Sequence, residues 1–460
     1  MRYRISLLAL TITLSLIDII PTFGFKPSSP PLKPGRKYTT IERLQPERLR
    51  AVSEGRTRYQ KSRHTVSIEM GYDDFRGVMH AHAEDSTHTG GTRPELLAAA
   101  KSVGVQFVML TDHVRPPRDF INVETRAMTD GVLFIPGVES EGFLVFPLRS
   151  FINAYIDNRY STREEFIKVA KSAAGIIFLS HVEERMDWPT TELDGLEIYN
   201  HHADFEDEDD FVKWLRASFT DPDRLRQLER SLAEYPMEVF GAAQDYPEQI
   251  IAKWDSVLTQ QKATGVSAND CHHNQVFTIK ASPPDAVFIN SVGESPRKVT
   301  IEQAPRVAEM LKNRAPNEVI AVLDFDPYDR SLRYVTTHLL MRGELTESSV
   351  RQALRQSHAY VAHDWLCDPT GFAFIAESGG KRAGVMGDVV KIAKGMKIRL
   401  EAPVAGQIKL FLNGRVIHKA ESDRLSFAVD GPGVYRAEVW LEVDGEMRPW
   451  IYSNAISVTK

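Results

Sequence analysis

The sequence contains few cysteines, no excess of basic residues and no apolar run long enough to cross a bilayer comfortably. Only Cys271 and Cys367 occur among 460 residues, which excludes a disulfide framework, and we expect two separate buried thiols. The formal net charge of −6 argues against a nucleic-acid-binding surface, because such surfaces are basic. It is compatible with a small anionic substrate, because a few arginines in one cleft can bind one.

The first 24 residues have the pattern of an export signal. Residues 1–4 supply positive charge, and residues 5–17 form an apolar run that Asp18 ends, too short to span a bilayer comfortably. We therefore expect an exported protein, periplasmic or extracellular, whose mature chain has no membrane span; an uncleaved signal anchor is the alternative. Residues 25–63 begin with a stretch rich in Pro, Ser and Lys and are expected to form a linker and a surface segment.

Short apolar runs alternate with helical segments from about residue 64 to residue 285. The expected strands are 75–82, 105–112, 132–140, 175–181, 194–200 and 263–270. The expected helices are 92–104, 162–175, 221–235 and 247–261, of which the first two begin at the N-cap residues Thr92 and Thr162. Runs of this kind are buried on both faces of a parallel sheet, so the alternation predicts an α/β fold, either a barrel or a doubly wound sheet.

The sequence beyond about Val385 changes to short strands separated by tight turns. Asn413-Gly414 and Asp444-Gly445 are hairpin signals. Residues 366–460 are therefore expected to form a small all-β sandwich resembling an immunoglobulin-type module. Residues 64–365, which close with a helix beginning at Thr346, are expected to form the main domain.

Potential metal ligands stand at the carboxyl end of almost every expected strand. His80 and His82 are two residues apart, so in a strand their side chains point to the same face. The other candidates are His113, Glu139, His181, His201 or His202, Asp270 and His272, with His88 in the loop after the first strand. Carboxyl ends of strands are where α/β folds assemble their sites, so we expect these residues to meet.

Nitrogen and carboxylate ligands without cysteine suit zinc, manganese or iron. One catalytic ion needs only three protein ligands and a water, so this larger set predicts two or three divalent ions. Glu139 is the expected bridging carboxylate. Neighbouring ions of this kind activate a water and stabilise the attacking and leaving oxygens of a displacement.

These motifs resemble those of the PHP (polymerase and histidinol phosphatase) metallohydrolases over about 200 residues. They read His80-Ala-His82, Thr111-Asp112-His113, Gly137-Val138-Glu139, an isolated His181, and Asp270-Cys271-His272. The resemblance implies a distorted (β/α)7 TIM-like barrel that holds two or three metal ions. The sequence departs from the family at Val78-Met79, where an aspartate often precedes the H-x-H motif.

The resemblance also implies the ligands of each ion. The first ion would be held by His80, His82, Glu139 and Asp270. The second would be held by Glu139, His181 and one histidine of the His201-His202 pair, of which we favour His202. The third would be held by His88, His113 and His272, with His273 a less favoured competitor of His272.

The function expected from the sequence is that of an exported metal-dependent hydrolase, most simply a phosphoesterase. Glu139 and Asp270 are the expected catalytic carboxylates. Arg115, Arg118 and Arg185 are candidates for binding the substrate anion through paired hydrogen bonds, although each is equally compatible with a solvated loop. The alternatives are hydrolysis of an amide, ester or carbamate by the same ions, and a non-catalytic metal-containing binding protein.

Overall fold

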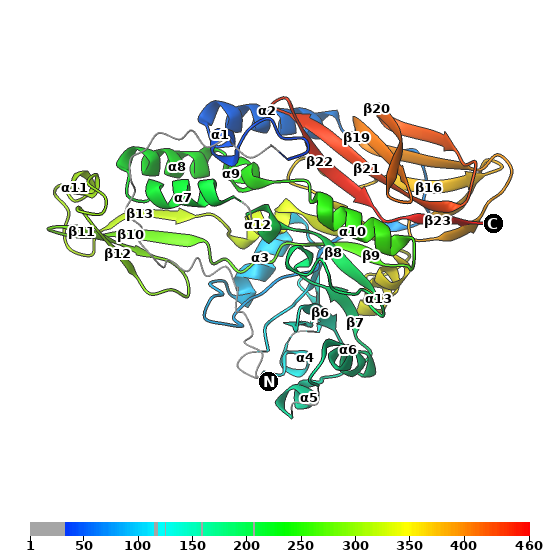
Figure 1. Ribbon diagram of the computed structural model, residues 1–460, viewed down its shortest axis with the longest axis horizontal. Coiled ribbons are helices and arrows are strands. Elements are labelled where there is room, and N and C mark those ends of the chain that lie inside the picture. The colour runs from blue at the N-terminus through cyan, green and yellow to red at the C-terminus, as the bar shows by residue number, and fades with distance from the viewer. Residues whose placement is uncertain (1–32, 115–117, 125, 158–159, 206–207) are drawn as a thin grey trace. The chain divides into compact units, whose positions relative to one another are not determined.

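Parallel strands and helices alternate in the first part of the computed structural model, which describes residues 33–460 except 115–117, 125, 158–159 and 206–207 (Figure 1). The fold is a mixed α/β one. Strand β1 (Asp73–Val78) pairs in parallel with β2 (Phe107–Met109), and β2 pairs in parallel with β4 (Val132–Ile135). All of β2 and β4 is buried, as expected for short apolar runs inside a parallel sheet.

A second sheet holds the later strands of the alternation. Strands β7 (Ile176–Leu179), β8 (Gly195–Asn200) and β9 (Thr264–Ala268) are parallel to one another. The sheet differs from a uniformly parallel one, because β6 (Phe143–Phe146) runs antiparallel to β7 and to β5 (Val138–Ser140). The expected strand 132–140 is thus divided between β4 and β5, where Pro136 offers no backbone N–H for pairing.

Two isolated bridges join the sheets where the parallel strands end. His113 pairs with Glu139, and Ala81 pairs with Cys271, in both cases in parallel. The N–H of His82 donates to the carbonyl oxygen of Cys271 over 3.0 Å. These bridges place the predicted ligands of distant segments side by side.

The expected helices are present. They are α3 (Arg93–Val103), α6 (Arg163–Ser172), α8 (Pro222–Glu234) and α10 (Glu248–Leu258), followed later by α13 (Glu347–Gln356). Thr92, Thr162 and Thr346 each accept a hydrogen bond from the backbone N–H three residues on, as N-cap residues do. Within the described ranges, no helix combines the length and apolarity needed to cross a bilayer.

An antiparallel sheet that the sequence pattern did not predict follows the Asp270–His272 motif. Its four strands run in the order β12-β11-β10-β13, and α7 (Asp209–Ser218), α8 and α11 (Val307–Met310) pack against it (Figure 1). The strands are β10 (Val276–Ser282), β11 (Ala286–Asn290), β12 (Arg297–Thr300) and β13 (Val319–Asp324). Alternate residues of β10 and β13 are buried, so the sheet has one packed and one open face.

The C-terminal strands contain both predicted hairpin turns. Asn413-Gly414 and Asp444-Gly445 have positive φ, as a two-residue hairpin turn requires. These strands are β19 (Lys397–Leu412), β20 (Arg415–Ala428), β21 (Gly433–Val443), β22 (Glu446–Ser453) and β23 (Ile456–Thr459). Strand β22 pairs with β15 (Ala359–Ala362), β15 with β14 (Thr336–Met341), and β14 with β1. Backbone hydrogen bonds between strands therefore connect the segments on the two sides of residue 365. The expected domain boundary at this residue stays a prediction.

The remaining elements are short except for one N-terminal helix. Helix α2 (Pro46–Ser62) packs against β21 and α9. The others are α1 (Thr40–Arg43), α4 (Phe120–Val123), α5 (Ile152–Ile156), α9 (Pro236–Phe240), α12 (Tyr328–Tyr334), β3 (Ala127–Thr129), β16 (Ala373–Ser378), β17 (Lys381–Val385) and β18 (Val389–Lys391). Cys271 and Cys367 are separate, buried free thiols, which confirms the expectation for both.

A buried histidine links β14 to β1, and we expect it to make stability depend on pH. The ring nitrogens of His338 lie 2.8 Å from Asp74 and 3.2 Å from Asp364. Burial acts to lower the pKa of His338, but the two carboxylates outweigh burial and raise this pKa to about 9. Because the folded pKa exceeds the unfolded value of about 6.5, the contribution is complete below about pH 6.5 and is lost as pH rises to about 9.

Urea unfolding of the chain and of a His338→Gln variant, from pH 6 to pH 9.5, measures this contribution. The difference in unfolding free energy between the two proteins should shrink by roughly 3 kcal/mol across that range. A difference that stays constant or grows with pH would show that His338 is neutral in the folded protein.

Candidate metal centre

His80 and His82 present their ring nitrogens to one point. Both side chains are completely buried, and their Nε2 atoms are 3.1 Å apart. The strand ends earlier than the sequence predicted, at Val78, so the bridge between Ala81 and Cys271 rather than β1 itself fixes this segment. The common orientation expected from the H-x-H spacing is nevertheless present.

Glu139 and Asp270 face these histidines from two other strand ends. Glu139 Oε2 lies 3.5 Å from His80 Nε2 and 3.7 Å from His82 Nε2, and Glu139 Oε1 lies 3.3 Å from His181 Nε2. Asp270 Oδ1 lies 3.3 and 3.5 Å from the same two nitrogens, and Asp270 Oδ2 lies 3.4 Å from His181 Nε2. Each carboxylate thus turns one oxygen to the H-x-H pair and the other to His181.

Five of the predicted ligand histidines direct Nδ1 to a carboxylate or carbonyl oxygen. The Nδ1 contacts are His80 to Glu197 (2.7 Å), His82 and His113 to Asp85 (3.0 and 2.7 Å), His181 to Glu183 (3.0 Å), and His272 to the carbonyl oxygen of Asp270 (3.0 Å). Because ionised carboxylates and carbonyl oxygens can only accept, each Nδ1 donates. In the neutral rings that bind metal, the Nε2 atoms then offer lone pairs.

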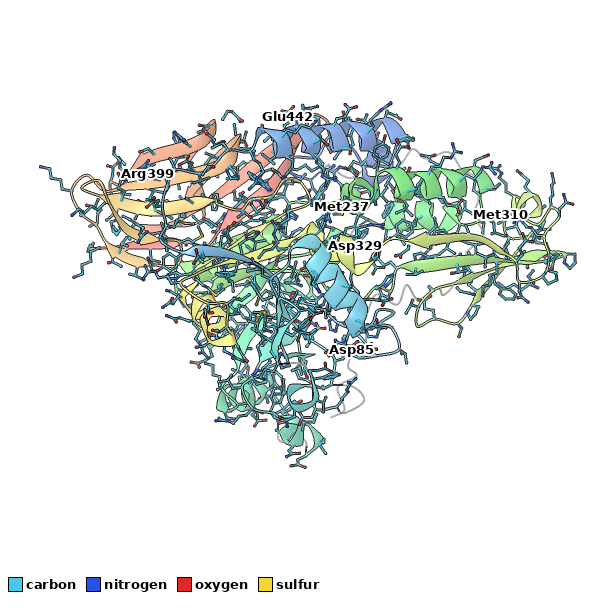
Figure 2. The ribbon with its side chains drawn as sticks, turned by 180° about the vertical axis from the view of Figure 1, so that it is seen from behind. Asp85, Met237, Met310, Asp329, Arg399 and Glu442 are labelled. Atoms are coloured by element: carbon cyan, nitrogen blue, oxygen red, sulfur yellow. The ribbon has the colours of Figure 1, made fainter. Side chains whose placement is uncertain are left out.

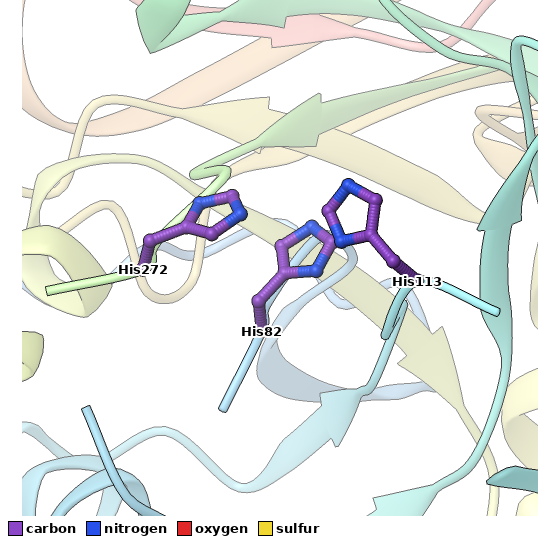
Figure 3. A group of neighbouring side chains, drawn as sticks. All are labelled: His82, His113 and His272. Carbon is purple, nitrogen blue, oxygen red and sulfur yellow. The ribbon is translucent and has the colours of Figure 1, made fainter. Parts of the chain in front are cut away.

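The rings of His82, His113 and His272 form a second convergent group (Figure 3). The His82 ring lies between the other two, with centroids 4.0 Å from His272 and 4.5 Å from His113. His88 lies next to this group, its ring centroid 5.0 Å from His113 and 4.9 Å from His272. The three histidines predicted for a third ion are therefore neighbours, although among the described residues the ligating atoms of His88 converge with no such group.

Of the His201-His202 pair, the structure describes the side chain of His201. The side chain of His202 lies outside the described residues. The ring of His201 is turned to Phe240 and Tyr334, with centroids 4.3 and 4.5 Å away, and its Nδ1 is 3.3 Å from Asp204. His201 therefore belongs to an aromatic cluster rather than to the convergent groups, and the preference for His202 stays a prediction.

The two candidate arginines that the structure describes, Arg185 and Arg118, both pair with a glutamate. Arg185 donates to the carbonyl oxygens of Ser180 (3.3 Å) and His181 (3.1 Å) and pairs with Glu184. Arg118 is nearly half exposed and pairs with Glu124 over 3.2 Å. Arg115 lies outside the described residues. His273, the competitor of His272, directs its Nε2 to Asp324 over 3.2 Å.

The charges of the centre shift the pKa values of its members in opposite directions. Burial acts to lower the pKa of His80, but Asp270, Glu197 and Glu139 hold this pKa well above its ordinary value. Burial acts to raise the pKa of Glu139 and of Asp270, but the neighbouring histidines hold both well below the ordinary range. The centre is thus built to keep two carboxylates ionised beside a positive charge.

Two of the predicted ligands have backbone angles that cost energy. His181 has φ of +42° and Asp270 has φ of +48°, in the left-handed region that non-glycine residues seldom adopt. Strain of this kind, of the order of 1 kcal/mol or more, is concentrated at functional sites. Here it turns the side chains of both residues back toward His80.

The donor set fits divalent metal ions. Three of the four convergent groups found among the described residues consist of predicted ligands: His80 with His82 and Asp270, His80 with Glu139 and His181, and His82 with His113 and His272. Among the described residues, Asp270 Oδ1 and His272 Nε2 are buried without a hydrogen-bond partner. Buried lone pairs that face one another repel unless a cation lies between them, so the arrangement suits nitrogen- and oxygen-binding metals.

Two carboxylates around the centre were not among the predicted site residues. Asp85 and Glu197 are 6% and 1% exposed, and each contacts two of the predicted ligand histidines. Figure 2 labels Asp85 on the loop that precedes α3. A signal existed for Glu197, because a charged residue in the wholly buried strand β8 needs a partner. No signal marked Asp85 among the polar residues of its loop.

The chain was compared with protein families, curated proteins and solved structures. No protein-family model matches the sequence, and no curated protein matches it. Among solved structures, the chain is similar to a two-domain protein from Bacteroides vulgatus containing a predicted PHP-like metal-dependent phosphoesterase, with 12% sequence identity and a TM-score of 0.33. The alignment covers 85% of this chain and 98% of that chain.

Proposed function

We propose that the chain is a metal-dependent hydrolase that cleaves phosphate esters. The observation that carries the proposal is the convergence of histidine Nε2 atoms on the Glu139 and Asp270 carboxylates. The sequence motifs that supply these residues support the resemblance to PHP metallohydrolases and, with it, a phosphoester substrate.

In this proposal Glu139 would be a ligand of two neighbouring ions, and Asp270 a ligand of one. The first ion would be held by His80, His82, Glu139 and Asp270. The second would be held by Glu139, His181 and His202, and a third by His88, His113 and His272. The division of the Glu139 and Asp270 oxygens between His181 and the H-x-H pair supports the first two. The neighbouring rings of His88, His113 and His272 support the third.

The bound zinc, manganese or iron ions would activate a water and stabilise charge that develops on the phosphoryl oxygens. Glu139 and Asp270 serve this chemistry as ionised ligands. Arg118 and Arg115 lie in the segment after His113 and would bind the substrate anion. Arg185 supports the His181 backbone through its carbonyl contacts, which makes it the weaker candidate for substrate.

The same proposal includes the finer fold and the location. A distorted barrel is supported by the two parallel strand sets and the bridges at their ends. An immunoglobulin-like C-terminal sandwich is supported by the hairpins of β19–β22. The signal-like N-terminus supports export to the periplasm or beyond, with a small anionic molecule as substrate.

Elemental analysis of the purified chain and hydrolysis assays test the function. We expect two or three ions of zinc, manganese or iron per chain, and phosphatase activity on aryl phosphates that a chelator removes and the metal restores. A His80→Ala variant should lose bound metal and activity together. Fewer than one ion per chain, or activity that survives the loss of metal, would contradict the proposal.

Substrate choice separates phosphoester cleavage from cleavage of a carbonyl compound. Aryl phosphates, aryl carboxylic esters and anilides release the same kind of coloured product, so one assay compares them. We expect the phosphates to be preferred, inhibition by inorganic phosphate, and weaker substrate binding in an Arg118→Ala variant. Activity confined to the carboxylic esters or anilides would overturn the phosphoester assignment while leaving the metal centre intact.

A further inference from the structure

Two buried carboxylates outside the proposed ligand sets each join two ligand histidines from different strand ends. Asp85 contacts His82 and His113. The Glu197 carboxylate contacts the His80 ring and the backbone N–H of His181. On this basis we infer that Asp85 and Glu197 are positioning residues of the metal centre. The inference rests on the proposed function, since it concerns the same ions.

Both carboxylate oxygens of Asp85 accept hydrogen bonds. Its Oδ2 accepts hydrogen bonds from His82 Nδ1 (3.0 Å), His113 Nδ1 (2.7 Å) and the His113 backbone N–H (2.9 Å). Its Oδ1 accepts from the Thr89 hydroxyl over 2.5 Å and lies 3.4 Å from the Ser86 hydroxyl. With both oxygens held, the carboxylate fixes the rings of His82 and His113 with Nε2 toward the centre.

Glu197, in β8, also accepts hydrogen bonds through both of its carboxylate oxygens. Its Oε1 accepts from His80 Nδ1 over 2.7 Å, and its Oε2 accepts from the His181 backbone N–H over 2.8 Å. Asn200 lies 3.3 Å from the same Oε2 through its amide nitrogen. Glu197 therefore fixes the tautomer of His80 and supports His181 in its left-handed conformation.

Asp85 and Asp112 also converge with His82 closely enough to form a potential metal group, but their contacts favour support over ligation. Asp112 forms an ion pair with Arg93 and accepts the Ala83 backbone N–H over 3.1 Å. Asp85 and the Nδ1 of His82 are already bonded to each other. The only lone pair His82 has left is on Nε2, which faces Asp270. Asp85 and Asp112 therefore support the proposed ligand His82 on the side away from the ions.

The two carboxylates serve different pairs of histidines, so each removal should affect the first ion, which His80 and His82 share, and one further ion: the third for Asp85 and the second for Glu197. We expect Asp85→Ala to weaken ions held by His82 and His113, and Glu197→Ala to weaken ions held by His80 and His181. The expected increase in the dissociation constant is about 10- to 100-fold. Titration of the metal-free chain with Mn²⁺ or Zn²⁺, followed by calorimetry, measures each step without any activity assay.

Conservative variants separate positioning from general support. Asp85→Asn and Glu197→Gln retain an acceptor oxygen and should recover part of the affinity that alanine loses. Asp326→Asn is the matched control, because Asp326 is also buried and holds backbone N–H groups near His272, those of Asn274 and Gln275, without contacting a ligand ring. It should lower the thermal midpoint and leave metal affinity unchanged.

The outcomes distinguish this inference from the function on which it rests. A wild-type chain that binds no divalent metal would overturn both. A wild-type chain that binds metal, with affinity in folded Asp85→Ala and Glu197→Ala variants within twofold of wild type, would overturn the inference alone. An equal loss of affinity in Asp326→Asn would also overturn it, by showing that any buried carboxylate near the centre has the same effect.

Discussion

An Asp270→Asn variant is expected to lose bound metal and about a thousand-fold in hydrolysis rate. Asp270 places oxygens within 3.5 Å of the Nε2 atoms of His80, His82 and His181, so its charge is central to the proposed ions. Bound metal supplies several kcal/mol of charge stabilisation, and about 4 kcal/mol corresponds to roughly a thousand-fold in rate. Asparagine keeps the size of the side chain and tolerates φ near +48°, so the loss reports the charge rather than the backbone.

Metal content by elemental analysis and turnover of an aryl phosphate are the measurements. His273→Asn is the control, because His273 also has positive φ but contacts Asp324 instead of the centre. It should keep its metal and its rate. An Asp270→Asn variant with full metal content and wild-type turnover would remove Asp270 from the centre and would contradict the proposed ligand set.

The second large effect concerns stability, since Arg436→Met is expected to lower the free energy of unfolding by about 3 to 5 kcal/mol. Arg436 is 1% exposed and donates to both oxygens of Asp255 in α10, over 2.5 and 2.7 Å, and to Glu438 over 2.7 Å. Methionine fills similar space but leaves the Asp255 carboxylate buried without its cation. Glu438 still accepts from Trp440 and Tyr246.

Urea unfolding of a double-mutant cycle checks this explanation. Asp255→Leu added to Arg436→Met should recover much of the loss, because the unpaired charge is then removed. If the double variant is as unstable as the sum of the two single variants, the cost comes from lost packing rather than from an uncompensated charge. The measurement also shows how strongly β21 is held to α10.

Local sequence signals predicted the strands and helices that carry the centre. Apolar runs such as 176–179 and the N-cap at Thr92 depend on neighbours only a few residues away, and the structure contains both elements. The position of ligands at strand ends follows from the same runs, because polar residues must appear where a buried strand leaves the core. His80 and His82 could therefore be placed together from their spacing.

Other features depend on partners that the sequence does not identify. The open face of the β10–β13 sheet weakens its apolar pattern, and its strands pair across hairpins and long connections. The pairing of β22 with β15 joins residues about ninety positions apart. Glu197 meets His80 across 117 residues, and one sequence offers no way to choose that partner among many acidic residues.

The isolated bridge at Cys271 has a consequence for chemical reactivity. Cys271 stands between Asp270 and His272, yet its thiol packs with Ala81, Leu96 and Tyr328 in an apolar cluster. It is 2% exposed, and burial raises the pKa of the thiol far above its usual range. The thiolate is the form that binds metals and reacts with oxidants. The Cys271 sulfur, one residue from two proposed ligands, therefore stays protonated. Alkylating reagents and peroxide should leave Cys271 unmodified in the folded protein.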